Sequence, residues 1–326
     1  MSKSGKSHAP LIGALLFVAA AAAFFVLAQM GVLDGLLGRN TQPQVPEQSI
    51  SEPSEPEPQS IDDYSWAELS ELSAKIAAAP TADEAIKIAA DAHLVNPDGT
   101  LTGEVKRIEL TDGTIAGFMI SDLWHDEKSD GSGHTGLSFV SDSAIALAPM
   151  NASGAITGGW EGSELRAWLA TEGMKLLPED MANALVEVTK LTNNVGHGAT
   201  ADSITPTNDK LWLYSAVEVC GPLNWYGQEY GGQWAYLDDV ANKEGFQYRL
   251  FAEQGVVSKS DPSGSLVRRY HGQKVSWWYR TTSIGVEQIY IGGNAGDFFY
   301  DVLDSGYPYG QGQPAEVQGV VVGFCL

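Results

Sequence analysis

The sequence predicts a membrane-anchored chain whose folded part is an α+β domain, with a mixed sheet, two flanking helices and long loops. Three observations lead to this prediction. An unbroken apolar run lies near the N-terminus, and a Pro- and Glu-rich stretch separates it from the rest of the chain. The 326 residues include 36 Gly and 9 Trp, which suits short strands and ordered loops better than a helical bundle. The stretch 274–282 carries large aromatic residues at both alternating sets of positions, as a central strand covered on both faces would.

The apolar run spans Leu11–Ala28 and follows two lysines. A membrane helix needs about 20 apolar residues, so we predict a transmembrane helix at 10–33. A cleaved signal peptide ending near Val26–Ala28 is the alternative, but its apolar region is normally only about 7–15 residues long. Few basic residues follow the run, which predicts a cytoplasmic N-terminus at 1–9 and an extracellular remainder in a single-pass protein of the cell membrane.

Residues 34–63 are dominated by Pro, Glu, Gln and Ser. Such a composition buries little apolar surface, so this stretch is predicted to be a disordered linker that acts as a stalk. The S/T-x-x-E capping pattern then occurs at 65–68 and again at 81–84. These two patterns predict a short helical pair at 64–96, as a spacer or as a lid packed on the main domain.

The central strand also contains an arginine. Trp277 faces one side of an extended strand here, whereas Trp278 and Arg280 face the other. An unpaired buried charge is costly, so Arg280 is expected to form a buried ion pair with a carboxylate. We expect the same of Arg166, and we assign both arginines a role in stability.

Cys220 and Cys325 are the only cysteines in the sequence. In an exported domain, two cysteines predict a disulfide between them. The alternative is a pair of separate buried thiols, because free cysteine is often fully buried.

The net charge and the spacing of metal-binding residue types indicate which classes of ligand are disfavoured. A formal net charge of −22 argues against nucleic acid as a partner, because nucleic-acid binding needs basic patches. The six histidines show no spacing typical of a zinc site. Asp126, Glu127 and Asp130 lie in a Gly-rich acidic stretch with the oxygen ligands that calcium prefers. A plain solvated loop is the interpretation that we favour there, so no cofactor is predicted.

We find no motif for catalysis. The sequence contains neither a Gly-x-Ser-x-Gly elbow nor a phosphate-binding loop, and 41 acidic residues make close carboxylate pairs common by chance. No catalytic residue is therefore predicted, and a non-enzymatic protein is favoured.

The aromatic segment, residues 225–236, is the most suggestive candidate for ligand binding. Aromatic rings on a loop that is fixed to a rigid scaffold suit sugar faces or protein hot spots. The alternative is that these rings fold under the loop as a satellite core. The candidate residues are Trp225, Tyr226, Tyr230, Trp234 and Tyr236.

A block of motifs then points to a family. In order it comprises Gly159-Trp160, Ser163, Arg166, Trp168-Leu169, Lys190, Asp209-Lys210-Leu211-Trp212-Leu213, Ser215, Glu218-Val219, Trp277-Trp278-Tyr279-Arg280-Thr281 and Gly323-Phe324-Cys325. This block resembles an uncharacterised family of domains of unknown function found in bacterial surface and secreted proteins. The resemblance covers 103–326.

That family is distantly similar to the C-type-lectin-like and formylglycine-generating-enzyme-like folds. The similarity implies a C-type-lectin-like domain at 103–326, and it hints at ligand display. With the anchor and stalk, it leads to the hypothesis of an extracellular recognition or adhesion module that binds a glycan or a surface protein. A structural cell-envelope protein without a small ligand is the first alternative, and an oxidase-type enzyme of the formylglycine-generating class is the second.

Overall fold

The computed structural model describes residues 60–284 and 296–326, which belong to one compact unit. The transmembrane helix predicted at 10–33 and almost all of the predicted linker lie outside the described residues. Within the described ranges, no helix has both the length and the apolar character needed to cross a bilayer.

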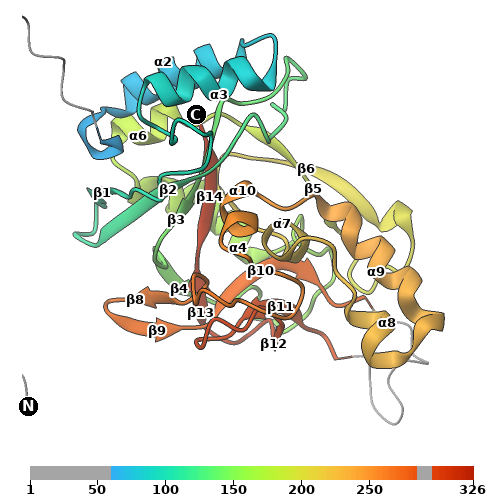
Figure 1. The fold of residues 1–326 in the computed structure, drawn as a ribbon. Helices are drawn as coiled ribbons and strands as arrows, with labels where there is room; N and C mark the ends of the chain where they lie inside the picture. Colours follow the sequence, from blue (N-terminus) through green and yellow to red (C-terminus); the bar gives the residue numbers. More distant parts are fainter. Residues whose placement is uncertain (1–59, 285–295) are drawn as a thin grey trace, which may run out of the picture. The chain divides into compact units, whose positions relative to one another are not determined.

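The fold is mixed α+β, as predicted, with several sheets and short helices (Figure 1). The first five-stranded sheet has the order β1 (Lys106–Glu109), β2 (Ile115–Leu123), β3 (Leu137–Ser141), β14 (Val322–Cys325) and β7 (Trp212–Leu213). The second has the order β12 (Gly310–Gly312), β11 (Phe299–Val302), β10 (Trp277–Thr282), β13 (Gln318–Val320) and β4 (Ala146–Ala148). Two ribbons pair β5 (Val188–Asn193) with β6 (Ile204–Asp209) and β8 (Arg268–Tyr270) with β9 (Gln273–Val275).

Helices surround the sheets and are mostly short. They are α2 (Trp66–Ala77), α3 (Ala82–Asp91), α4 (Glu164–Trp168), α5 (Met174–Leu176), α6 (Glu179–Ala184), α7 (Ala216–Cys220), α8 (Trp225–Tyr230), α9 (Ala235–Ala241) and α10 (Arg249–Glu253). The 3-10 turns are η1 (Ile61–Asp63), η3 (Ala201–Ser203), η4 (Gly232–Trp234) and η5 (Asn242–Glu244), and η2 (Leu169–Gly173) is a π-helical turn between α4 and α5.

The last two strands join the two large sheets. β13 pairs with β10 and β4 in the second sheet, and β14, one residue later, pairs with β3 and β7 in the first. Val321 between them is fully buried. The C-terminal segment therefore runs through the centre of the fold, and Figure 1 shows its red ribbon passing from one sheet to the other.

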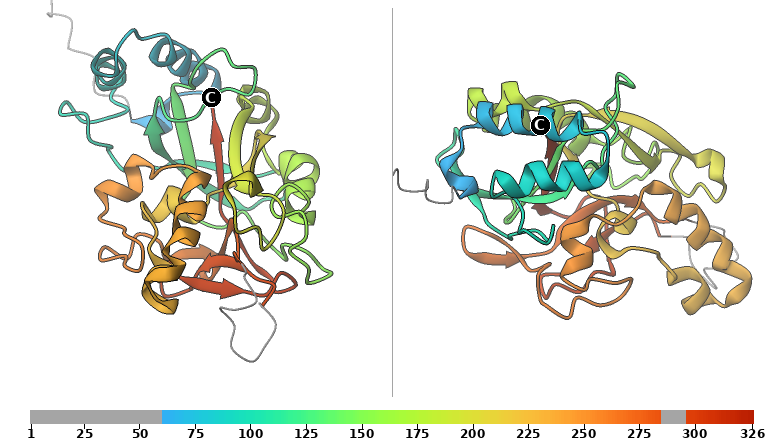
Figure 2. Two further views of the ribbon diagram at one scale, coloured as in Figure 1. Left: turned by 90° about the vertical axis from the view of Figure 1, so that its right-hand side faces the viewer. Right: turned by 45° about the horizontal axis from the view of Figure 1, so that its top comes forward.

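The helical pair α2–α3 packs into the first core. The ring of Trp66 makes edge contacts with Phe118, Phe139 and Phe324, with centroids 5.8–6.3 Å apart. The Ser73 hydroxyl donates to the carbonyl of Leu326, and Figure 2 shows α2 beside the C-terminus in both views. The two helices therefore contribute to the same core as the first sheet.

The two predicted helix starts differ in detail. At Ser65 both halves of the capping box form, because the hydroxyl accepts from the Glu68 amide and the Glu68 carboxylate accepts from the Ser65 amide. At Thr81 only the hydroxyl contact to the Glu84 amide is present. Both contacts satisfy a donor of the first helical turn that would otherwise lack an acceptor.

The core divides at β10, whose six residues are all buried. Trp278 packs in the cluster with the first sheet and α2, whereas Trp277 and Tyr279 pack in a second cluster with α7, α8 and α10. Successive side chains of this one strand point to opposite faces, so they contribute to two different apolar clusters.

The structure contradicts the predicted disulfide. Cys220 and Cys325 are both free buried thiols, and they belong to different core clusters. Burial raises the pKa of Cys220 to about 12 and raises that of Cys325 well above its ordinary value. The alternative of two separate buried thiols therefore describes the structure.

Candidate functional site

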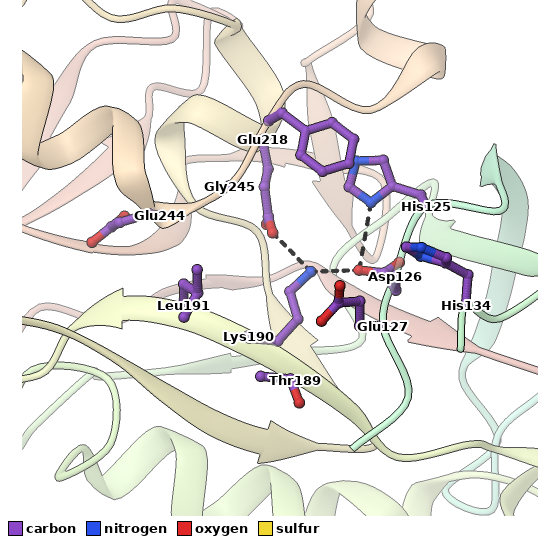
Figure 3. A pocket seen from close by; sticks show the side chains of 11 residues that line it. His125, Asp126, Glu127, His134, Thr189, Lys190, Leu191, Glu218, Glu244 and Gly245 are labelled. Carbon is purple, nitrogen blue, oxygen red and sulfur yellow. Dashed lines mark hydrogen bonds and ion pairs between the residues drawn. The ribbon is translucent and has the colours of Figure 1, made fainter. Parts of the chain in front are cut away.

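A pocket of about 260 Å³ opens beside the β5–β6 ribbon (Figure 3). We call it the His125 pocket. Its walls come from the loop after β2, from β5, from α7 and from the segment that follows η5. The lining residues are His125, Asp126, Glu127, His134, Thr189, Lys190, Leu191, Glu218, Glu244, Gly245 and Phe246.

Lys190 lies at the centre of the pocket floor. Its Nζ is 2.7 Å from Asp126 Oδ1, 2.7 Å from Glu218 Oε1 and 2.8 Å from the Tyr248 hydroxyl. Figure 3 shows the ammonium between the two carboxylates. Two of its three donors form hydrogen bonds with Asp126 and Tyr248, and the Glu218 carboxylate lies in ion-pair contact.

A second cation lies behind Lys190. The Arg280 guanidinium is 0% exposed, and it binds both oxygens of Glu218 at 2.5 and 2.8 Å. Its remaining donors reach Thr192 Oγ1 and the carbonyl oxygens of Leu191, Leu213 and Glu244. Arg280 is thus buried and fully paired, as a charge in a core must be.

Charge pairing sets the ionisation of the network. Burial opposes ionisation of Asp126, but Lys190 and His125 outweigh it and hold the pKa of this carboxyl well below its usual value. Burial likewise opposes ionisation of Glu218, but Arg280 and Lys190 outweigh it and lower its pKa. The same two carboxylates raise the pKa of Lys190 against the effect of its own burial. The buried ions therefore stabilise each other as charged pairs.

Glu244 differs from the other carboxyl groups. Burial dominates its surroundings and raises its pKa to about 7, despite the nearby Arg280. One of its oxygens accepts from the Asn193 amide at 3.0 Å, and the other accepts from the Thr281 hydroxyl. Glu244 thereby attaches the end of η5 to β5 and β10.

His125 lies between two aromatic rings at the mouth of the network. Its ring is 3.8 Å from Tyr248 and 4.0 Å from Phe246, measured between centroids. His125 is only 8% exposed, yet neither ring nitrogen has a hydrogen-bond partner. Nδ1 lies 3.6 Å from Asp126 Oδ1, which is an electrostatic contact beyond hydrogen-bond length. His125 therefore brings unused hydrogen-bonding capacity to the pocket wall.

Phe246 forms the outer rim of the pocket and is 62% exposed. Gly245 places it there with φ of 147°, and a Cβ at this glycine would lie 3.0 Å from Glu218 Cγ. Only a residue without a side chain suits this backbone conformation so close to Glu218. The ring is thus held over the pocket by the backbone that precedes it.

The predicted site residues of the aromatic segment do not form an open surface. The segment is helical, in α8, η4 and α9, rather than a loop. Trp225 and Tyr226 are each 1% exposed, and the Trp225 indole donates to the Ser258 carbonyl at 2.6 Å. Tyr230 and Trp234 are half-buried, and only Tyr236 is exposed. Trp225 and Tyr226 are core residues with no surface to offer a ligand, because their rings fill the second cluster.

The predicted calcium ligands are not gathered around one point. Asp126 is buried and bound to Lys190, whereas Glu127 and Asp130 are exposed. Asp130 accepts from the Ser132 amide of its own turn. Across residues 60–284 and 296–326, we find no group of three His, Cys, Asp or Glu side chains arranged to hold a metal ion.

The two arginines expected to form ion pairs occupy different environments. Arg280 lies in the network described above, and Arg166 Nε binds Asp209 Oδ1 at 2.7 Å with its side chain 25% exposed. Lys190 is also buried, and it shares a face of β5 with the buried Val188 and Thr192. Its partners come from segments distant in sequence, and periodicity carries no information about them.

The family comparison agrees with the resemblance inferred from the motifs. The family model described as a domain of unknown function (DUF6273) matches residues 136–300, half of the chain. This range is narrower than 103–326; it includes Lys190, Glu218 and Arg280 and leaves out His125. Searches among curated proteins and among solved structures found no match. The chain belongs to the DUF6273 family, whose domain has no assigned function.

Proposed function

We propose that this protein is a membrane-anchored extracellular recognition module that binds a glycan, and that the His125 pocket is its ligand site. The observation that carries the proposal is the exposed Phe246 ring packed at 4.0 Å against a buried histidine without hydrogen-bond partners. A pocket with an apolar face and a few convergent polar groups is the usual form of a small-ligand site. The ligand site that we propose therefore lies in the His125 pocket, whereas the sequence analysis placed it in the aromatic segment.

The charge balance of the pocket favours a neutral ligand. Lys190 is paired with two carboxylates and all donors of Arg280 are occupied by protein acceptors, so an anionic ligand would find no unpaired cation in the buried network. Asp126 and Glu218 are neutralised by the same two cations. The remaining groups are an aromatic face, imidazole nitrogens and the exposed carboxylate of Glu127. These groups suit the C–H face and the hydroxyls of a sugar.

We also propose a C-type-lectin-like arrangement for the domain. Its support is the position of the C-terminal strand, because β14 lies between β3 and β7 and completes the sheet begun by the β1–β2 hairpin. The anchor at 10–33 and the linker, which ends before the folded turn η1 at Ile61 and so before its predicted end at 63, would then hold the domain outside the cell membrane. A C-terminal tag that resists added protease on intact cells, and is cut only after lysis, would contradict this orientation.

A glycan array tests the ligand class with the full chain in detergent. We expect glycan binding that Phe246→Ala reduces at least tenfold, which corresponds to about 1.4 kcal/mol of binding free energy. Tyr307→Ala is the matched control, since it removes another exposed ring that does not line the pocket. No binding to any glycan, or equal binding by the Phe246→Ala variant and the wild type, would overturn the proposal.

A structural envelope protein is the second candidate. The observation that favours it is the burial of Trp225 and Tyr226, which removes two rings from the predicted binding surface. This candidate predicts an empty array together with retention of the chain on purified envelope material. The oxidase alternative needs a reactive thiolate, and burial raises the pKa of both thiols, which does not favour it.

A further inference from the structure

We infer that the ligand is a linear oligosaccharide of at least two units, because the His125 pocket shares its rim with a second hollow. This inference rests on the proposed function and defines its ligand more narrowly. The second hollow has a volume of about 560 Å³, compared with about 260 Å³ for the first. It is lined by Leu191, Ala201, Ile204, Asn242, Lys243, Gly245 and Phe246.

Three residues line both hollows: Leu191, Gly245 and Phe246. Leu191 and Phe246 are 41% and 62% exposed, so they form an apolar ridge between the two hollows. A ligand unit in either hollow would contact the same ridge. Two hollows with a common wall suit consecutive units of one chain, whereas two unrelated ligands would compete for the ridge.

The ridge is fixed on both sides. Leu191 lies in β5, and its carbonyl accepts from Arg280 Nη2 at 3.2 Å. The backbone before Phe246 is attached through Glu244, whose carbonyl accepts from the same Nη2 at 3.1 Å. One buried guanidinium therefore sets the spacing of the two sides. Such preorganisation lowers the entropy cost of binding an extended ligand.

The two hollows differ in chemistry. Four carboxyl groups line the His125 pocket, whereas the second hollow has none and is lined by Ala201, Ile204 and the exposed Lys243. The first hollow offers the polar groups that orient a sugar ring. The second offers mainly apolar contact, which adds affinity for a further unit with little demand on its hydroxyl pattern.

Ala201 provides the variant that separates the two hollows. It is exposed in the short turn η3 and lines only the second hollow of the two, so Ala201→Glu adds bulk and charge there without disturbing a buried site. Ala235→Glu is the matched control, because Ala235 is also exposed and lines neither hollow.

The experiment measures binding to the full chain by titration calorimetry. The probes are N-acetylglucosamine, glucose and mannose, each as the monosaccharide and as linear oligomers from the dimer to the hexamer. We expect one series in which the tetramer binds at least about tenfold more tightly than the monosaccharide. Ala201→Glu is expected to remove most of that gain and to leave monosaccharide affinity unchanged, while Ala235→Glu changes neither.

The outcomes separate the two proposals. Equal affinity for monosaccharide and oligomers, or an oligomer gain that Ala201→Glu does not reduce, overturns the extended ligand and leaves the glycan site at the His125 pocket in place. No binding by any of the three series, together with an empty glycan array, overturns the proposed function and this inference with it.

Discussion

The aromatic segment and the His125 pocket place aromatic rings in opposite settings. In the segment, the rings of Trp225 and Tyr226 are buried against Tyr300, Tyr309 and neighbouring apolar residues. In the pocket, Phe246 is exposed and covers a histidine above a charged network. Clustered aromatic residues here belong to a core, and an isolated exposed ring marks the candidate site. Local aromatic density is therefore a weaker guide to a ligand site than exposure beside buried polar groups.

The charged network is the part of the pocket whose loss should cost most. Arg280→Leu would leave the buried Glu218 without its bidentate partner, and we expect a loss of about 3–5 kcal/mol in the free energy of unfolding. Chemical denaturation of the purified chain measures this loss.

Arg166→Leu is the comparison variant for Arg280. Its ion pair with Asp209 is partly exposed, so we expect a loss of about 1 kcal/mol. If both variants lose the same free energy of unfolding, then the burial of an ion pair does not determine how much that pair contributes to stability.

The second prediction concerns the aromatic segment. Trp225→Ala removes a buried ring and its hydrogen bond to Ser258, which should lower the free energy of unfolding by about 3–4 kcal/mol. Tyr236→Ala, at an exposed ring of the same segment, should change stability by less than about 0.5 kcal/mol. If Trp225→Ala unfolds at the wild-type midpoint, the ring is not part of the core.

The sequence was informative where the determinants are local. Alternation identified the strand around Trp277 and Trp278, and the capping pattern located the starts of α2 and α3 within one residue. The exposure of the aromatic segment was not predictable in this way, because a run of rings separated by glycines fits an open loop as well as short helices. In the structure the Asp238 carboxylate of α9 accepts from the amides of Tyr226 and Gly227 in the first turn of α8, a contact across the segment that satisfies donors of that turn.

The pocket could not be predicted, since its parts are distant in sequence. Lys190 and Asp126 are 64 residues apart, and Arg280 and Glu218 are 62 apart. Alternation along the strand predicted that Arg280 is buried, but nothing local in the sequence identified Glu218 as its partner or placed Lys190 beside Asp126, and only the fold brings these residues together. The disulfide prediction failed for the same reason, because the two cysteines lie in different clusters.

The third prediction uses pH to distinguish Glu244 from the other carboxyl groups of the pocket. Burial raises its pKa from 4.5 to about 7 in the folded chain, so the folded state binds a proton more tightly than the unfolded state. The resulting stability is fully present below pH 4.5 and is lost as the pH rises through about 7. Over this window the lost contribution is about 3 kcal/mol.

Glu244→Gln isolates that contribution. Glutamine keeps the shape and does not titrate, so the wild type should become less stable relative to this variant as the pH rises from 4.5 to 7. Denaturation curves at a series of pH values give the difference. A stability difference that stays constant across this window would show that Glu244 titrates alike in the folded and unfolded chains.

The smallest expected effect on stability is the most informative for function. Phe246 is exposed and its ring packs on one face of His125, so Phe246→Ala should change the free energy of unfolding by less than about 0.5 kcal/mol. The same change should reduce glycan binding at least tenfold, whereas Trp225→Ala should reduce binding only to the extent that it unfolds the chain. A loss of stability by Phe246→Ala similar to that of Trp225→Ala would place both rings in the same structural role. Stability and glycan binding are measured on the same variant. A ring that stabilises the fold should lower the free energy of unfolding when it is removed, whereas a ring that contacts the ligand should lower only the affinity.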